Sequence, residues 1–294
     1  MSTGPAYGAA AGLVERSAAA FAAAIPEQPA DDGYFGPATV TWRLAADLSA
    51  IVAGLRALLL QALHPLAMAG VDQHSNWRHD PVGRLAATSA YLATITYGDR
   101  AAADRAAAQV RRIHDHVRGT DTVTGQPYAA SDPALLLWVH ATFTESGLVA
   151  ASLFGSQLAP AEADAYVRET RVSAELLGVP RDLLPADVNS LQAYIASVVP
   201  TLIRTPAAAE SITYLLDPPG MEEDIADLWQ DVREGVLAAL PSWALSRYEY
   251  EPPPPLTPER RTEIRQTLGL FDAVFLGEPG VLEARQRIAL RQRG

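Results

Sequence analysis

All six histidines of this chain lie between His64 and His140, in a segment that is otherwise largely apolar and helical in its pattern. Because the chain has no cysteine and no lysine, an imidazole nitrogen is the side-chain group best suited to anchor iron or haem. The lack of cysteine also excludes disulfides, iron–sulfur clusters and cysteine-ligated zinc. A histidine on an apolar helix face is more often a hydrogen-bonded core residue than a ligand, so each candidate also has a structural interpretation.

His114 is the first candidate for a buried imidazole. In the helix predicted over residues 99–119, an apolar face includes Ile113 and Val117, and His114 lies on the flank of that face. His116 points further away. The alternative for His114 is a solvated residue near a helix end, where a positive charge is favourable.

Arg84, Thr88, Tyr91 and Ile95 share one face of the next helix upstream, at positions i, i+4, i+7 and i+11. An arginine and a threonine on the same stripe as tyrosine and isoleucine are unusual for a plain core face. A partly buried arginine needs an anionic partner. That partner is either an Asp or Glu side chain or a carboxylate of a bound cofactor.

His140 is the rival ligand. It begins a line of small or polar residues that continues through Thr144, Gly147 and Ala151 on a helix that is apolar almost all round. Small residues allow a close approach to the backbone, either by a neighbouring helix or by a flat macrocycle.

His64 and Gln61 are the best candidates for polar groups inside an apolar pocket, since they lie three residues apart on one helix stripe. Their structural alternative is a hydrogen-bonded role in the core or at a helix end. His74 and His79 fall in turn regions, where solvent-facing or capping roles are expected.

No common catalytic motif accompanies these residues. The chain has no Glu-x-x-His pair for a di-iron bundle, no Gly-x-Ser-x-Gly, no His-Glu-x-x-His, no phosphate loop and no Gly-x-Gly-x-x-Gly.

The candidates must be positioned by helices, because strand signals are nearly absent. The sequence predicts an all-α fold, a single multi-helix bundle-like domain. Helices are predicted over 41–63, 80–97, 99–119, 131–155, 160–178, 186–203, 206–216, 222–240 and 258–268. Residues 71–75 are predicted as a turn and 120–130 as a loop. A break is expected at His64-Pro65, because proline disfavours helical geometry in the residue before it.

Three regions are predicted. Residues 1–33 read as a flexible N-terminal arm with one helix around 13–24, and residues 34–250 as the helical domain. Residues 251–294 read as a proline-rich linker and a C-terminal helical tail that either packs back or engages a partner. At 294 residues and 49% hydrophobic content, the chain can bury a sizeable core without disulfides.

A net charge of −11 argues against nucleic acid as a partner. The apolar stretches 57–71 and 135–158 contain His64, His140 and Glu145, so they read as buried core helices and not as transmembrane segments. No signal peptide is recognised at the N-terminus, so a cytoplasmic location is expected.

Six motifs together resemble the oxygenase family that includes latex clearing protein, a rubber oxygenase, and the fungal oxygenase MpaB. The resemblance covers roughly residues 34–250. The motifs are Tyr34-Phe35-Gly36-Pro37 leading to Trp42-Arg43; Arg56–Pro65; Gly70-Val71 with His74-Ser75; Asp80-Pro81 with Gly83-Arg84; Val110–Gly119; and Asp132–Ala141.

The resemblance implies an all-α domain with globin-like helical packing around a haem b pocket and one proximal histidine, which by motif is His114. It places Arg84 and Thr88 in the catalytic pocket. Latex clearing protein has a lysine before that threonine as a distal ligand; Ala87 stands here, which implies an open distal side. The acidic base of the rubber enzyme has no secure match, and His64 is the nearest polar group.

The resulting hypothesis is a haem b-dependent oxygenase that acts with dioxygen on a lipophilic, isoprenoid-like or alkene-bearing substrate. Arg84 would bind a haem propionate or orient bound oxygen, Thr88 would donate a hydrogen bond and His64 would assist proton movement. The alternative is a non-catalytic helical protein that binds haem or lipid or serves in assembly. The sequence leaves open the substrate, the reductant, the number of oxygen atoms transferred and a homo-oligomeric state.

Overall fold

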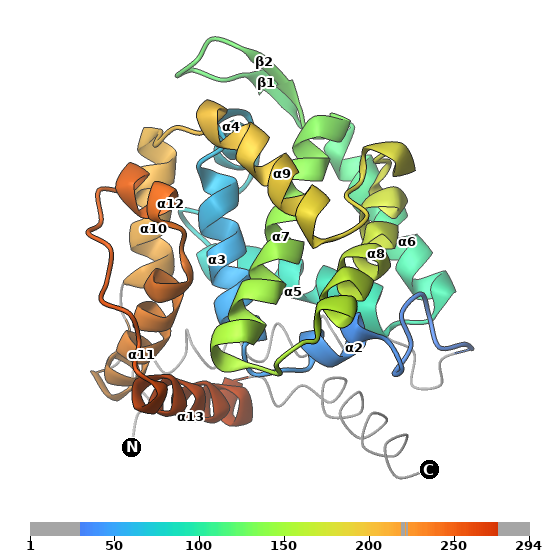
Figure 1. The fold of residues 1–294 in the computed structure, drawn as a ribbon. Helices are drawn as coiled ribbons and strands as arrows, with labels where there is room; N and C mark the ends of the chain where they lie inside the picture. Colours follow the sequence, from blue (N-terminus) through green and yellow to red (C-terminus); the bar gives the residue numbers. More distant parts are fainter. Residues whose placement is uncertain (1–29, 219–220, 222, 276–294) are drawn as a thin grey trace, which may run out of the picture.

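A computed structural model describes residues 30–218, 221 and 223–275, and within them the fold is all-α apart from one two-stranded sheet (Figure 1). The predicted fold class is therefore confirmed. The helices are α2 Val40–Ala45, α3 Ala50–Ala62, α4 Pro65–His74, α5 Pro81–Tyr97, α6 Arg100–His114, α7 Pro133–Phe154, α8 Pro160–Leu177, α9 Val188–Val198, α10 Pro206–Leu216, α11 Glu223–Ala239, α12 Ser242–Arg247 and α13 Pro258–Phe275. Short 3-10 turns follow at Arg181–Leu183 and Val199–Thr201, and the strands are β1 Arg118–Thr120 and β2 Pro127–Ala129.

Helices α3 and α7 form the central pair of the domain, and the other helices pack around them (Figure 1). The start of α7 is fixed by Asp132, whose side chain accepts a hydrogen bond from the Ala134 N–H, and by Pro133 in the first turn. Leu59, Leu60 and Trp138 are fully buried between the helices. The nearly continuous apolar surface of α7 is explained by this central position.

A buried ion pair joins the two central helices. The guanidinium of Arg56 is 1% exposed as a residue and donates to both carboxylate oxygens of Glu145. It also donates to the Ser146 hydroxyl at 2.7 Å and to the Ala239 carbonyl at 2.8 Å. Four acceptor atoms surround this cation, and these hydrogen bonds offset much of the cost of its burial.

The break at His64-Pro65 is confirmed, since α3 ends at Ala62 and α4 begins at Pro65 with a bend of 100°. The turn predicted over 71–75 is wrong, because α4 continues to His74. Its last turn is held by the hairpin, where the Tyr128 hydroxyl bonds to Gln73 at 2.9 Å and to His74 at 3.1 Å. Tertiary contacts therefore extend a segment with weak helical pattern.

Helix α6 ends at His114 and not at the predicted Gly119. The following residues instead form the β1–β2 hairpin, with Arg118 opposite Ala129. The turn is stabilised by Asp121, whose carboxylate accepts from Val123 and Thr124. Strands of three residues are too short to show a regular alternation, which is why this segment is predicted as a loop.

Two further predicted helices are divided in the structure. The helix predicted over 41–63 breaks between α2 and α3, where the Asp47 carboxylate accepts from the Ser49 N–H at 2.9 Å. The helix predicted over 186–203 ends as α9 at Val198 and continues as a 3-10 turn containing Pro200. Helix α12 was not predicted.

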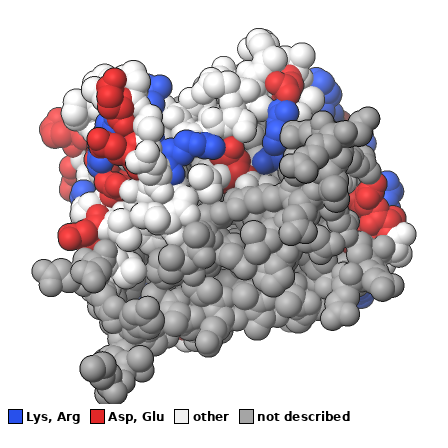
Figure 2. Space-filling model, turned by 90° about the horizontal axis from the view of Figure 1, so that it is seen from below, with Lys and Arg blue, Asp and Glu red and all other residues white. Residues whose placement is uncertain are grey.

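The face shown in Figure 2 carries acidic and basic side chains beside one another over its described part. The predicted arm, residues 1–33, lies outside the described residues apart from 30–33, as does the tail beyond 275.

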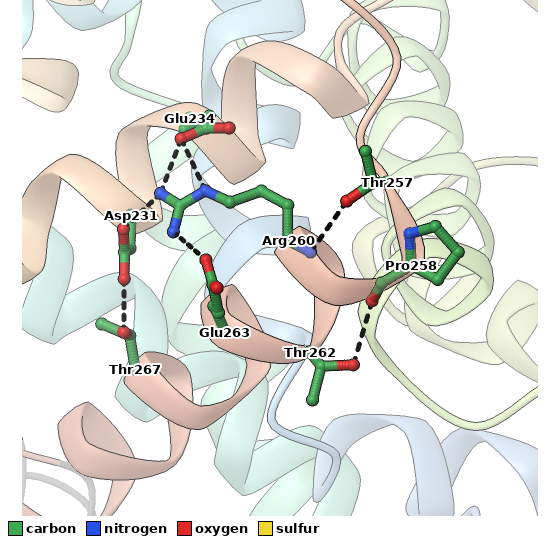
Figure 3. Close-up of polar contacts among 8 residues, drawn as sticks. All are labelled: Asp231, Glu234, Thr257, Pro258, Arg260, Thr262, Glu263 and Thr267. Carbon is green, nitrogen blue, oxygen red and sulfur yellow. Dashed lines mark hydrogen bonds and ion pairs between the residues drawn. The ribbon is translucent and has the colours of Figure 1, made fainter.

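Helix α13, the part of the predicted C-terminal tail that the structure describes, packs back onto the domain. Ile264, Leu268 and Phe271 enter the main core. Arg260 of α13 donates hydrogen bonds to two carboxylates of α11, to Asp231 at 2.5 Å and to Glu234 at 2.7 Å (Figure 3). These carboxylates raise the pKa of Arg260.

Within the described residues, α7 is the one continuous helix long and apolar enough to cross a membrane, and 56% of its apolar window is buried inside the protein. The bent pair α3–α4 meets the same test of length and composition when taken as one segment. Burial of α7 among other helices is typical of a core helix.

Candidate functional site

His114 lies on the buried face of α6. The buried Ala103 and Ala107 and the half-buried Val110 and His114 follow one another at i, i+4, i+7 and i+11. Ile113 was predicted on this apolar face, and that part of the prediction is wrong because Ile113 is 54% exposed. The helix turns its alanines inward, since small side chains let α5 and α8 approach closely. His114 therefore faces the interior more directly than the sequence indicated.

His116 is exposed, as expected, and its Nδ1 lies 2.7 Å from the Arg112 carbonyl. This hydrogen bond caps the end of α6. Of the two histidines at this helix end, His114 is the one directed inward.

Arg84 stands one turn inside α5, which begins at Pro81 with the Asp80 carboxylate accepting from the Gly83 N–H. The Arg84 side chain is accessible by area, yet desolvation lowers its pKa. Among the described residues no carboxylate pairs with this guanidinium.

The structure brings Arg84 and His114 together electrostatically. The pKa of His114 is lowered first by burial and then by the charge of Arg84. A neutral imidazole, the form that binds a metal ion, is thereby favoured near neutral pH.

Thr88, Tyr91 and Ile95 continue the face of α5 that begins at Arg84, as their spacing predicted. The Thr88 hydroxyl donates to the Arg84 carbonyl at 3.1 Å. The Tyr91 hydroxyl is buried without a hydrogen-bond partner in the described part of the chain, and burial raises its pKa. Ile95 is only 2% exposed. Along this face of α5, the side chains are therefore buried at Ile95 and exposed at the cationic Arg84.

His64 is the N-cap of α4, where its Nδ1 accepts a hydrogen bond from the Ala67 N–H at 3.5 Å. Burial lowers its pKa. In the neutral ring this contact leaves the proton on Nε2. The ring centroid lies 6.2 Å from that of Trp138, whose indole N–H is buried without a partner among the described residues. His64 therefore has the expected role at a helix end, and its Nε2 proton remains available for donation.

Gln61, on the preceding turn, donates to the Thr142 hydroxyl at 3.1 Å. This bond ties the amide to α7, so Gln61 serves the packing of the two central helices.

His140 is a residue of α7, and Arg171 of α8 is its charged neighbour. Burial, followed by the charge of Arg171, lowers its pKa to about 4, although the residue is only half-buried by area.

The line of small residues that starts at His140 accommodates helix α8. The hydroxyls of Thr144 and Thr170 lie 3.3 Å apart. A Cβ on Gly147 would lie 2.4 Å from the Tyr166 hydroxyl. Of the two occupants considered for this line, the neighbouring helix is the one present.

Gly54 marks an open face on the central helix α3. A Cβ built on this glycine meets no heavy atom of the described residues within 4 Å. Leu58 and Gln61, which follow at i+4 and i+7, are half-buried, whereas Leu59 and Leu60 on the opposite side are fully buried. Glycine inside a helix costs about 1 kcal/mol relative to alanine, so packing of the described residues does not account for it. The sequence signal for this open face is a glycine inside a predicted helix.

No group of three or more His, Asp or Glu side chains in the described part of the chain could hold a bare metal ion. The five predicted site residues stand on α4 to α7. The structure couples Arg84 to His114, links Thr88 to Arg84, and leaves His64 and His140 on separate elements.

Comparison with known proteins gives one match. The family model described as "ER-bound oxygenase mpaB/B'/Rubber oxygenase, catalytic domain" matches residues 42–273, which run from α2 into α13. No curated protein and no solved structure matches the chain.

Proposed function

The chain belongs to the family of ER-bound oxygenase mpaB/B' and rubber oxygenase catalytic domains, and we propose that it is a haem b-dependent oxygenase with His114 as the iron ligand. Its substrates would be dioxygen and a lipophilic molecule, isoprenoid-like or alkene-bearing. The oxygenase class follows from the family, whereas the haem, the substrate class and the residue roles belong to this proposal.

One observation carries the choice of His114. Its imidazole is on the inward face of α6, and burial and the charge of Arg84 lower its pKa, which favours the neutral ring. A porphyrin supplies four nitrogens to its iron, so a single protein imidazole is sufficient where a bare ion would need several ligands. The donor set near His114 therefore suits haem better than a protein-only metal site.

Two further features fit a haem. Arg84 remains a cation despite its lowered pKa, and no described carboxylate neutralises it, so it is suited to a propionate. Open space beside Gly54 on α3 gives a flat or apolar molecule a close approach to a helix backbone.

The bound haem would supply iron chemistry for oxygen transfer. Arg84 would hold the propionate and keep positive charge at the edge of the site. Thr88, one turn along the same face, would offer a hydroxyl once its bond to the Arg84 carbonyl is exchanged. Ala87 has no side-chain atom that could bind iron.

His64 would hold or donate a proton at Nε2, because its Nδ1 is engaged as the cap of α4. His140 remains the alternative iron ligand, since its lowered pKa also favours a neutral ring. The apolar surfaces of α3 and α7 would exclude water from a lipophilic substrate. A cytoplasmic location stays a prediction.

The test is spectroscopic. Protein produced with a haem supply should show a Soret band, and His114→Ala should abolish it. His116→Ala, two residues away on the exposed side, is the matched control and should keep the band. Added imidazole should restore the band in His114→Gly if the cavity is intact. Loss of the band in His140→Ala but not in His114→Ala would transfer the ligand role to His140.

A colourless, well-folded preparation would favour the alternative of a non-catalytic lipid-binding or assembly protein. Loaded protein should then be tested for oxidised products with isoprenoid alkenes and dioxygen. A Soret band without any product would support a haem-binding protein that is not an oxygenase.

A further inference from the structure

A recess lies on the exposed side of α6. It has a volume of about 410 Å³ and is lined by His74, Gln109, Arg112, Ile113, His116 and Val117. The α6 residues Gln109, Arg112 and Ile113 follow one helix face at i, i+3 and i+4, with His116 at i+7. His114 belongs to the inward face of the same helix, so the two sites use opposite sides of one element.

The floor of this recess is apolar. Ile113 is 54% exposed, which makes it one of the most exposed large hydrophobic side chains among the described residues, and Val117 lies beside it. Exposed apolar surface inside a concave site is typical of a place where a ligand binds. The volume lies within the range of small-molecule sites, about 300–1,000 Å³.

The rim of the recess is cationic or neutral, and no carboxylate lines it. Arg112 forms no ion pair with a described residue, and its carbonyl is engaged by His116. This local balance contrasts with a chain whose net charge is −11. Charge complementarity therefore favours an anionic head group above the apolar floor.

The β1–β2 hairpin holds two of the residues that line the recess in place. His74, at the end of α4, is held by the Tyr128 hydroxyl of β2 at 3.1 Å. Val117 is tied to the base of the hairpin, where its carbonyl accepts from the Ala130 N–H at 2.8 Å. The imidazole of His74 and the floor residue Val117 are thus positioned by one small substructure.

We infer that this recess binds a small lipophilic carboxylate, with its acid group at Arg112 and its hydrocarbon body on Ile113 and Val117. The site does not depend on the presence of haem. It would give the protein a second ligand site that touches the helix carrying His114 from the outside.

The experiment is calorimetric titration of the full-length chain with octanoate as the probe. Octanol tests the hydrocarbon body without the charge, and acetate tests the charge without the body. Saturable binding is expected for octanoate, and it should be several-fold tighter than for either control. No saturable binding of octanoate, or equal binding of octanol, would overturn the inference.

Two substitutions locate the ligand. The substitution Arg112→Gln should weaken the binding of octanoate about threefold, the size expected for loss of an exposed ion pair. It should leave the binding of octanol unchanged. Ile113→Ser should weaken both probes. Arg105→Gln, on the exposed side of the same helix, is the matched control and should change neither. Unchanged octanoate affinity in both Arg112→Gln and Ile113→Ser would mean that the acid binds elsewhere, which contradicts the inference.

Discussion

Arg84 on α5 and His114 on α6 interact electrostatically across the interface of their two helices, and the guanidinium adds to burial in lowering the pKa of the imidazole. Asp115 raises the pKa of His114, but its effect is smaller than those of burial and of Arg84, so the pKa stays lowered. The pair combines a neutral potential ligand with an unneutralised cation.

Replacing Arg84 by glutamine should raise the pKa of His114 toward its ordinary value, because the positive neighbour is removed while burial remains. The measurement is an NMR titration of the imidazole in haem-free protein. Arg105→Gln serves as the control for loss of a charge from the exposed surface. A His114 pKa that does not move in Arg84→Gln would show that the two groups are not close in solution.

His140 should make the protein less stable in acid. Its pKa is about 4 in the folded protein against an ordinary value of 6.5. Between these values the unfolded chain binds more protons, so the free energy of unfolding falls as the pH decreases from about 6.5 to about 4. The loss amounts to at most about 3 kcal/mol for this one group.

The substitution His140→Gln removes that titration. The free energy of unfolding of the wild type should therefore fall toward that of the variant as the pH decreases from about 6.5 to about 4. Urea denaturation at a series of pH values gives the free energies. His116→Gln is the control, because its ring is exposed. Parallel curves for wild type and His140→Gln would mean that water reaches the His140 ring freely.

Arg56 and Glu145 should be the most costly polar pair to break. Arg56→Met leaves a half-buried carboxylate without its cation, which is expected to cost about 3–5 kcal/mol of unfolding free energy. Chemical denaturation measures this value. Arg43→Met is the matched control, since its pair with Glu162 is more exposed and should cost no more than about 1 kcal/mol. Equal costs for the two variants would contradict the assignment of Arg56–Glu145 as a buried pair.

Local sequence signals predicted most of the helix starts. Asp80-Pro81 and Asp132-Pro133 each place a capping side chain before a proline in the first turn, and both helices begin there. The proline after His64 also predicted the sharp bend between α3 and α4. These signals act within a few residues, so they can be recognised without knowledge of the fold.

Features that depend on distant contacts could not be predicted. The β1–β2 hairpin is stabilised by its pairing and by α4, and residues 117–130 alone show no strand pattern. The inward face of α6 was misjudged because alanines carry little hydrophobic signal, although Ala103 and Ala107 are fully buried. The partners of His140 on α8 lie far away in the chain, so no spacing rule could indicate them.

Arg260→Ala should loosen α13 without unfolding the central helices. The guanidinium joins Asp231, Glu234 and Glu263, so its removal leaves three carboxylates close together (Figure 3). The expected loss is about 1–2 kcal/mol, more than for an isolated surface pair. Faster hydrogen exchange in α13, with unchanged exchange in α7, is the measurement. Arg204→Ala, whose pair with Glu249 is exposed, provides the control.

Substitutions at Gly54 test whether this glycine is needed for packing or for a ligand. Its Cβ position is open, so Gly54→Ala should raise the free energy of unfolding by about 0.5–1 kcal/mol through helix propensity alone. Gly147→Ala is the contrasting control, because a Cβ there meets the Tyr166 hydroxyl and should lower the stability.

Gly54→Phe should leave the fold intact and reduce haem loading, since the ring would fill space that the proposed ligand needs. Stability comes from denaturation and loading from the Soret absorbance per protein. If Gly54→Phe folds and loads haem fully, the open face of α3 is not part of the haem site. It would then remain available to the lipophilic substrate, and a loss of substrate binding in the same variant would identify it as that surface.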